Sequence, residues 1–509
     1  MKKLSFQILS LLLIFCASCV STKAESNNPN NPKREFRGAW LHVIGQTQWA
    51  EKSPEQQRKY IIDQFDKLGE AGCNAVIFQV RPCADALYIS EYEPWSVYLT
   101  GKRGKAPNPL WDPMEFAIEE AHKRGMEFHA WLNPYRVSAQ PSDKPTPEMD
   151  YSRNRERYVH YDNKIFFDPA YQENRDFICM IVEDIVSRYD VDAIHIDDYF
   201  YPYPASSGAK FPDDASYKKF GGGQNLGDWR RENVNKLIQQ LNKTIKTTKP
   251  WVRFGVSPFG IWRNKKSDPR GSETNGFQNY DGLYADVLLW DKNGWIDYLA
   301  PQLYWALDKK EASTRHLLKW WNDNIKNVDL YIGYDTRQTM STADSKTGSS
   351  NELDTKVKLS RQYPNIQGVI WWHGYWVTEN FKGVKDKLNN THQRTIALPP
   401  VYGDPDKKPE PVKNLKLAND RNSVVLEWTG PKPGNRASET DAVRYVVYEF
   451  LPGEDPEDLD NVEAIIQVTP YQSIVITENG DKSALKDHTY VVTSLDRMNR
   501  ESKPVKLKI

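Results

Sequence analysis

Short apolar segments alternate with stretches of helical periodicity from residue 34 to about residue 395. This alternation is typical of parallel sheets, because each pair of parallel strands needs a crossover connection. The strand candidates are 36–43, 75–81, 127–133, 192–199, 253–259, 298–305, 330–335 and 368–374. The helical patterns cover 54–70, 113–124, 172–189, 228–247, 313–327 and 352–363. Eight such units predict an α/β fold of the (β/α)8 or TIM barrel type over residues 34–397.

An open, doubly wound sheet is the competing arrangement for the same alternation. Its usual mark is a glycine-rich phosphate loop directly after the first strand. Here the first strand continues as HVIGQTQW, which contains no such loop. The barrel is therefore favoured.

The C-terminal part has a different pattern. Residues 398–411 (LPPVYGDPDKKPEP) are rich in proline and charge and are interpreted as a linker. Residues 412–509 contain short alternating strands, and Trp428 lies on the second of them. This spacing resembles a fibronectin type III domain, a small all-β immunoglobulin-like sandwich. Because it shows no catalytic cluster, we expect a spacer or scaffold, able to contact other cell-envelope proteins.

The N-terminus has the features of an export signal. Lys2 and Lys3 precede a short apolar run, and Cys19 follows small residues, as at a lipoprotein processing site. We expect residues 1–19 to be a signal peptide, Cys19 to be lipidated and 20–33 to be a tether. The protein would then be exported to the cell envelope and held on a membrane by lipid alone. Cys16 stands where a Leu-like residue is usual, so ordinary cleavage further along remains an alternative.

Charge and cysteine content exclude several classes of protein. Lys plus Arg and Asp plus Glu each number 68, so no strong field is available to hold nucleic acid. Cys73, Cys83 and Cys179 are too few for a disulfide framework, and no His/Cys cluster has metal-ligand spacing. We therefore expect neither a metal nor a cofactor.

The fourth strand carries the strongest chemical signal, in DAIHIDDYFYP. His195, Asp197 and Tyr199 share one parity and are expected to face the barrel interior. Asp197 would then lie at the mouth, where barrel active sites are built, with Asp198 on the rim. Two adjacent carboxylates raise the pKa of one of them, which is what a general acid requires.

The same reasoning gathers further polar and aromatic groups at the ends of the other strands. They are Trp40, His42, Gln79, Arg81, Asp85, His129, Trp131, Asn133, Tyr135, Arg136, Ser257, Gln302, Tyr304, Asp335, Arg337, Trp371 and His373. Any one of them can equally be a core residue with satisfied hydrogen bonds. Their convergence on one barrel end, however, favours a carbohydrate cleft, in which polar groups bind hydroxyls and rings stack on sugars.

Glycoside hydrolysis normally uses two carboxyl groups. The candidate partners of Asp197 are Asp198, Asp335, Asp85, Glu91 and Glu93. We take Asp197, Asp198 and Asp335 as the catalytic candidates and leave the order among the partners open.

Six motifs in order resemble the glycosyl hydrolase-like family 10. They are REFRGAWLHV, NAVIFQVRPCADALY, FHAWLNPYR, DAIHIDDYFYP, FGVSPFGIWRN and YLAPQLYW. The resemblance implies a TIM barrel, an exported and often lipoprotein context, and hydrolysis of glycans, with peptidoglycan strands as the leading substrate. The plan is also similar to chitinase-like barrels, but Tyr199 occupies the place of their acidic proton donor. Asp197 or Asp198 would have to act instead.

Two functions of different class follow from these features. The first is a glycosidase acting on peptidoglycan or a related amino-sugar polymer. The second is a non-catalytic glycan-binding surface lipoprotein of a polysaccharide-uptake system. A hydrolase for dietary or host polysaccharide is a third, weaker hypothesis. A metal-dependent deacetylase is disfavoured, because the histidines form no obvious ligand set.

Overall fold

The computed structural model describes residues 31–46, 49–140, 143–420, 423–478 and 482–509. The expected signal peptide, Cys19 and the tether up to residue 30 lie outside the described residues. Among the described helices, none combines the length and the apolar character needed to cross a membrane.

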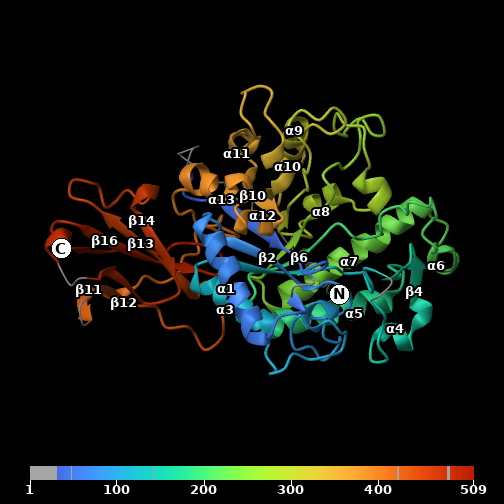
Figure 1. Cartoon of the computed structure of the whole chain (residues 1–509), viewed down its shortest axis with the longest axis horizontal. Helices are drawn as coiled ribbons and strands as arrows, with labels where there is room; N and C mark the ends of the chain where they lie inside the picture. Colours follow the sequence, from blue (N-terminus) through green and yellow to red (C-terminus); the bar gives the residue numbers. More distant parts are fainter. Residues whose placement is uncertain (1–30, 47–48, 141–142, 421–422, 479–481) are drawn as a thin grey trace, which may run out of the picture.

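Eight parallel strands form a closed barrel (Figure 1). In chain order they are β1 (Phe36–Leu41), β2 (Ala75–Arg81), β3 (Glu127–Leu132), β6 (Ala193–Ile196), β7 (Arg253–Val256), β8 (Tyr298–Leu299), β9 (Asp329–Asp335) and β10 (Ile366–Trp372). Strand β10 pairs with both β9 and β1, which closes the sheet. The TIM-barrel prediction is confirmed, and each predicted strand overlaps an observed one.

Helices follow the strands and pack on the outside of the barrel (Figure 1). The long ones are α1 (Pro54–Glu70), α3 (Pro113–Lys123), α5 (Gln172–Arg188), α7 (Leu226–Thr248), α9 (Thr314–Asn324) and α11 (Leu353–Gln362). The shorter ones are α2 (Val97–Thr100), α4 (Asp150–Arg153), α6 (Asp214–Phe220), α8 (Val287–Asn293), α10 (Thr336–Ser341), α12 (Gly374–Thr378) and α13 (Val384–Lys387). Local signals set their starts: Ser53 and Gln56 form a capping box before α1, and Asp112 caps α3.

The barrel interior is filled by side chains of one strand parity. The apolar ones are Phe36, Trp40, Ala75, Ile77, Trp131, Ala193, Tyr298, Ala300, Tyr331 and Ile370. Gly255 makes room for this packing, because a Cβ at that position would overlap the ring of Tyr298. The interior is therefore a packed core and not a pore.

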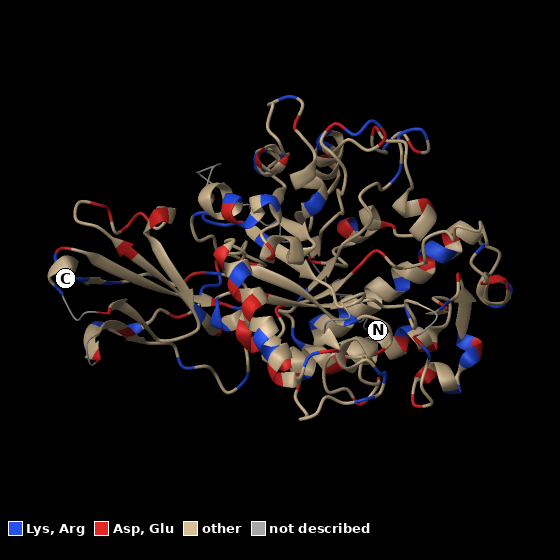
Figure 2. Cartoon of the chain, viewed as in Figure 1, with Lys and Arg blue, Asp and Glu red and all other residues tan. Residues whose placement is uncertain are grey.

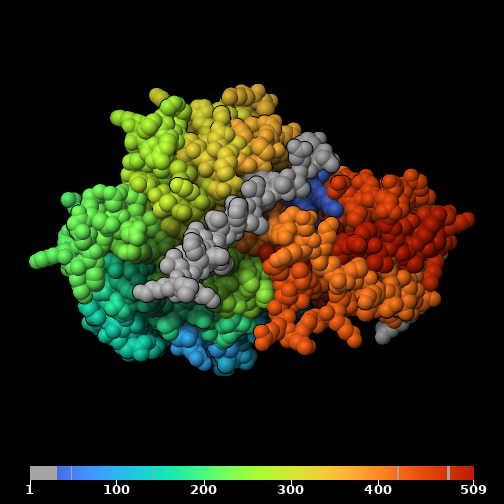
Figure 3. All heavy atoms as spheres, turned by 180° about the vertical axis from the view of Figure 1, so that it is seen from behind, coloured from blue at the N-terminus to red at the C-terminus, as the bar shows by residue number. Residues whose placement is uncertain are grey.

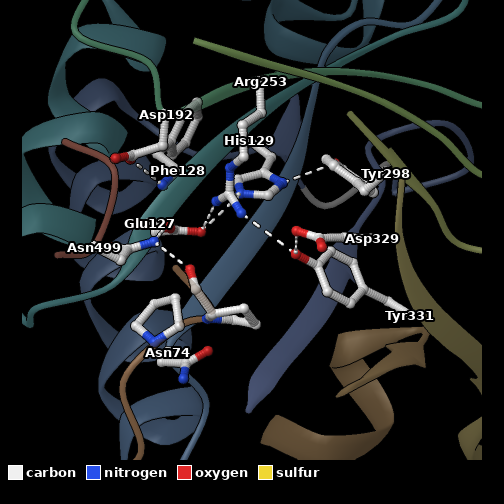
Figure 4. Close-up of polar contacts among 12 residues, drawn as sticks. Asn74, Glu127, Phe128, His129, Asp192, Arg253, Tyr298, Asp329, Tyr331 and Asn499 are labelled. Carbon is white, nitrogen blue, oxygen red and sulfur yellow. Dashed lines mark hydrogen bonds and ion pairs between the residues drawn. The ribbon is translucent and has the colours of Figure 1, made fainter. Parts of the chain in front are cut away.

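Polar groups at the base of the barrel form a buried network (Figure 4). The Arg253 guanidinium pairs with Glu127, and His129 contacts both the Glu127 carboxylate and the Tyr298 hydroxyl. The same hydroxyl lies 2.9 Å from Nδ1 of His195, one layer higher. Burial raises the pKa of Glu127, but the charge of Arg253 and the hydrogen bond from His129 lower it by more than burial raises it. The pKa is therefore below its usual value and the carboxylate is ionised.

The C-terminal residues form two antiparallel sheets that pack face to face. One contains β11 (Lys413–Asp420), β12 (Ser423–Thr429) and β15 (Ser473–Thr477). The other contains β14 (Ile465–Thr469), β13 (Ala442–Phe450), β16 (Thr489–Asp496) and β17 (Val505–Lys508). Trp428 and Tyr445 meet between the sheets, with ring centroids 5.5 Å apart. The all-β sandwich is confirmed, whereas the fibronectin type III assignment stays a prediction.

The sandwich lies beside the barrel (Figures 1 and 3) and contacts the end where the strands begin. Asn499 donates a 2.8 Å hydrogen bond to Oε1 of Glu127, the first residue of β3 (Figure 4). Arg444 donates to the carbonyl of Gly125 and to Oδ1 of Asn499. The sandwich therefore completes the polar network at the base of the barrel. Basic and acidic residues are interspersed over both parts of the molecule (Figure 2).

Candidate active site

A cavity of about 630 Å³ lies at the opposite end, where the barrel strands finish. Its walls come from the ends of the strands and from a hairpin formed by β4 (Tyr158–Tyr161) and β5 (Lys164–Phe167). The lining residues are Trp40, His42, Ile44, Gln79, Trp131, Arg136, Ala139, Tyr161, Asp162, Lys164, Phe166, Asp197, Asp198, Tyr199, Pro202, Tyr203, Pro204, Ser257, Gln302, Tyr304 and Trp372. Its volume lies within the usual range for small-molecule sites, roughly 300–1,000 Å³.

Aromatic rings form the floor of the cavity around Trp372. The Trp372 ring is parallel to that of Tyr304, at 6.2 Å between centroids and 9° between planes. The rings of Trp131 and Trp40 lie edge-on to that of Trp372, with centroids 6.1 and 6.4 Å from its centroid. The rings of Trp372 and Tyr304 are partly exposed and provide stacking faces for the apolar side of a sugar.

Asp197 lies just beyond the end of β6 and is held by neighbouring side chains. Asn133 donates to both carboxylate oxygens, at 3.0 and 3.2 Å, and Trp131 Nε1 donates at 3.2 Å. Burial raises the pKa of Asp197, while the charge of Arg136 and these hydrogen bonds act in the opposite direction. On balance the pKa of Asp197 is raised by burial, and the contacts fix the orientation of its carboxylate.

Asp198 faces the same cavity and keeps its proton more readily. Burial and the adjacent charge of Asp197 raise its pKa to about 7. The Tyr203 hydroxyl donates to its Oδ2, and this bond, together with one to Gln302, limits the shift. A carboxyl group with a pKa near 7 can be protonated at neutral pH and can give its proton to a leaving group.

Two histidines near the cavity are neutral. His195 lies beneath Asp197, and burial lowers its pKa well below 6.5. Its Nε2 lies 2.9 Å from Ser257 Oγ and 3.2 Å from Trp40 Nε1. His42 lines the cavity, and burial and the nearby His373 lower its pKa to about 3. Neither imidazole adds charge to the site at neutral pH.

The cavity brings together eleven of the predicted residues. They are Trp40, His42, Gln79, Trp131, Arg136, Asp197, Asp198, Tyr199, Ser257, Gln302 and Tyr304. Asn133, His195 and His129 lie below it, and the first two support cavity residues through hydrogen bonds. Their contact with a substrate would therefore be indirect.

Asp335 is placed differently from the other two catalytic candidates. Its side chain accepts a hydrogen bond from the Gln338 amide as the N-cap of α10, and it is absent from the cavity lining. Asp85 pairs with Arg103, and Glu93 pairs with Arg81. Among the candidate partners of Asp197, Asp198 is therefore the one that lines the same cavity.

Two predicted orientations were wrong, at Arg81 and at Trp371. A bulge in β2 places Arg81 opposite Leu132, whose side chain faces the helices, so Arg81 leaves the interior. In β10 the inward positions include Ile370 and Trp372, and Trp371 packs outward against Tyr334. A run of apolar residues gives no alternation from which parity could be read.

Sequence reasoning missed the hairpin wall and Tyr203. The turn residues Asp162 and Asn163 both have positive φ, as a two-residue hairpin loop requires. The pattern YVHYDNKIFF was therefore a readable hairpin signal. Tyr203 lies in a Tyr- and Pro-rich loop whose course no periodicity predicts. Within the described part of the chain, no three His, Cys, Asp or Glu side chains are grouped to hold a metal ion.

A (β/α)8 barrel with an acidic pair in an aromatic cavity at its strand ends has the architecture of a glycoside hydrolase. Comparison with known families agrees. The chain belongs to the family described as Glycosyl hydrolase-like 10, whose model matches residues 35–348.

Named relatives extend the similarity beyond that match. The chain is 37% identical over 484 residues to Glycosyl hydrolase YngK of Bacillus subtilis, covering 93% of each protein. It is 37% identical over 402 residues to Glycosyl hydrolase DigH of Escherichia coli K12, covering 71% of this chain and 90% of that relative. Among solved structures, the PgaB (BpsB) glycoside hydrolase domain of Bordetella bronchiseptica matches with a TM-score of 0.45 and 11% identity, over 70% of this chain and 98% of that one.

Proposed function

We propose that the protein is a glycoside hydrolase that cleaves O-glycosidic bonds of a polysaccharide by carboxylate acid–base catalysis. The observation that carries the proposal is the pair Asp197 and Asp198 in one aromatic cavity, with the pKa of Asp198 raised to about 7. Asp198 is the general acid and Asp197 the second carboxylate.

The reaction divides between the two groups. Asp198 protonates the glycosidic oxygen as the bond between that oxygen and the anomeric carbon breaks. The Asp197 carboxylate, oriented by Asn133 and Trp131, stabilises the positive charge that develops on the sugar. Water supplies the hydroxyl that ends on the anomeric carbon, and its remaining proton restores the acid.

Peptidoglycan glycan strands, or a related amino-sugar polymer, are the substrate we propose. The stacking faces of Trp372 and Tyr304 and the size of the cavity suit a run of sugar rings. The export signal read in residues 1–19, with lipid on Cys19, would bring the enzyme to the cell envelope, where this polymer lies. Membership of a glycosyl hydrolase-like family supports a glycan as the substrate.

Asp197→Asn tests catalysis against glycan binding alone. A hydrolase should lose kcat by about 10²-fold or more, because the neutral amide cannot stabilise the developing charge, while the Kd for glycan changes little. The release of reducing ends measures kcat, and isothermal titration calorimetry measures the Kd for glycan. A variant that keeps its full rate would rule out the proposed role, and a wild-type protein that binds without cutting would favour the non-catalytic alternative.

The substrate is tested by digesting purified peptidoglycan strands beside a panel of plant and host polysaccharides. We expect soluble fragments from the amino-sugar polymers. Cleavage confined to the plant or host polysaccharides would support a hydrolase for dietary or host polysaccharide, and the roles of Asp197 and Asp198 would stay as proposed.

A further inference from the structure

Charged side chains of both signs line the cavity. They are Arg136, Asp162, Lys164, Asp197 and Asp198. Lys164 and Asp162 form an ion pair at 3.1 Å and compensate each other. The guanidinium of Arg136, in contrast, forms no ion pair and no side-chain hydrogen bond with any residue that the structure describes. Arg136 is 7% exposed, so its charge is buried beside a cavity without a bonded counter-ion.

The arginine is held in place by contacts that leave its donors unused. Its guanidinium lies over the ring of Tyr199, 4.2 Å from the centroid. Its backbone amide donates to Oδ1 of Asn133 at 2.9 Å, and its backbone bridges to Phe166 of the hairpin. Stacking on an aromatic ring uses the face of a guanidinium, whereas its N–H groups lie in the plane. The side chain is therefore ordered before any ligand arrives.

A buried cation is costly unless an anion or hydrogen-bond acceptors compensate it. The Asp197 carboxylate interacts with Arg136 through space, but it lies beyond ion-pair distance and its oxygens already accept from Asn133 and Trp131. The free N–H fork matches the two oxygens of a carboxylate. A ligand carboxylate would supply the compensation that the protein lacks.

We propose that Arg136 forms an anion subsite that binds a carboxylate carried on a sugar of the substrate. This inference rests on the proposed function, because it assigns an acidic sugar to one wall of the same cavity. The carboxylate could belong to the lactyl ether of a muramic acid residue or to the ring of a uronic acid. Both present the same planar anion to the guanidinium.

The test compares one polymer in two charge states. Peptidoglycan strands freed of peptide carry lactyl carboxylates, and carbodiimide coupling with ammonia converts these to neutral amides. We expect the wild-type kcat/KM to fall about 10- to 100-fold on amidation, the range for hydrogen bonds to charged groups. Arg136→Met should lose a similar factor on the carboxylate form and about 3-fold or less on the amide form.

Lys164→Met is the matched control, because it removes a cation from the same cavity that already has a carboxylate partner. The ratio of kcat/KM between the two polymer forms should stay within about 3-fold of the wild-type ratio. Arg136→Lys keeps the charge but loses the fork, and it should recover part of the preference. Should the arginine variants fold poorly, a wild-type enzyme indifferent to amidation would still overturn the inference.

Three results would overturn the inference: a wild-type enzyme indifferent to amidation, an Arg136→Met variant whose kcat/KM falls by the same factor relative to wild type on both forms, or a Lys164→Met variant that loses the preference as fully as Arg136→Met. The second would show that Arg136 acts only through Asp197. Calorimetry with muramic acid disaccharide and with an oligouronide separates this failure from that of the proposed function. Arginine-dependent binding without cleavage would contradict the proposed enzyme activity and support the anion subsite. The ligand that binds more tightly identifies the source of the carboxylate.

Discussion

At the scale of single residues, the position of the protons decides what the site can do. Asp197 and Asp198 are neighbours in the chain, yet their surroundings differ: Asn133 and Trp131 donate to the first, while burial and the charge of Asp197 raise the pKa of the second to about 7. The sequence predicted this pair and the raised pKa, because adjacent carboxylates repel. It could not predict which of the two would be raised further, since that depends on Arg136, Asn133 and Trp131, which limit the rise at Asp197.

Tyr203 offers a test in pH. Its hydroxyl donates to Asp198 and stabilises the ionised carboxylate, so Tyr203→Phe should raise the pKa of Asp198 further. Because the acid acts when protonated, activity falls as pH rises through this pKa, near 7 in the wild type. The variant should therefore move the alkaline limb of kcat/KM to higher pH.

Asp198→Asn is the companion variant. It should lower kcat by about 10²- to 10⁴-fold, the usual contribution of a general acid, and its residual activity should lack the limb near pH 7. A Tyr203→Phe profile that shifts to lower pH, or an Asp198→Asn profile that keeps the limb, would contradict the assignment.

At the scale of elements, strand parity predicted most of the cavity and failed where a strand departs from regular alternation. On β6 and just beyond its end, His195 and Asp197 face inward as expected, because apolar and polar residues alternate clearly there. The bulge in β2 and the apolar run in β10 leave no such alternation, so Arg81 and Trp371 were misplaced. The hairpin wall depends on long loops, whose course tertiary packing sets.

The two tryptophans at the end of β10 give a matched pair for mutation. Trp372 faces the cavity, and Trp371 is buried against the helices. Trp372→Ala removes a stacking face and should raise KM about 3- to 10-fold with a small change in unfolding free energy. Trp371→Phe should instead lower the unfolding free energy by about 1–3 kcal/mol and leave KM unchanged.

Steady-state kinetics and urea unfolding of both tryptophan variants check this contrast. If Trp371→Phe raised KM and Trp372→Ala did not, the observed orientation of β10 would be incorrect.

At the scale of the whole molecule, the sandwich and the barrel share a buried polar contact. Asn499, which is 1% exposed, bonds to Glu127 and accepts from Arg444. Asn499→Leu leaves both partners short of a hydrogen bond and should lower the free energy of unfolding by about 2–4 kcal/mol. The sequence predicted the sandwich, but the linker gave no indication of where it docks.

Arg394→Ala is the control for the docking contact. Arg394 pairs with Glu463 across the same two parts of the chain, but both side chains are about half exposed. Loss of this exposed ion pair should change the free energy of unfolding by about 0.5 kcal/mol or less. Thermal and urea unfolding compare the two variants, and equal effects would mean that the buried contact does not fix the sandwich.

The docked sandwich and the entry of the described chain share one end of the barrel. Lys33 and Arg34 pair with Glu501, so the described chain enters the barrel at the end that the sandwich covers. The acidic pair lies in the cavity at the opposite end. A polymer bound across that open end would therefore stay clear of both the sandwich and the entry point of the described chain.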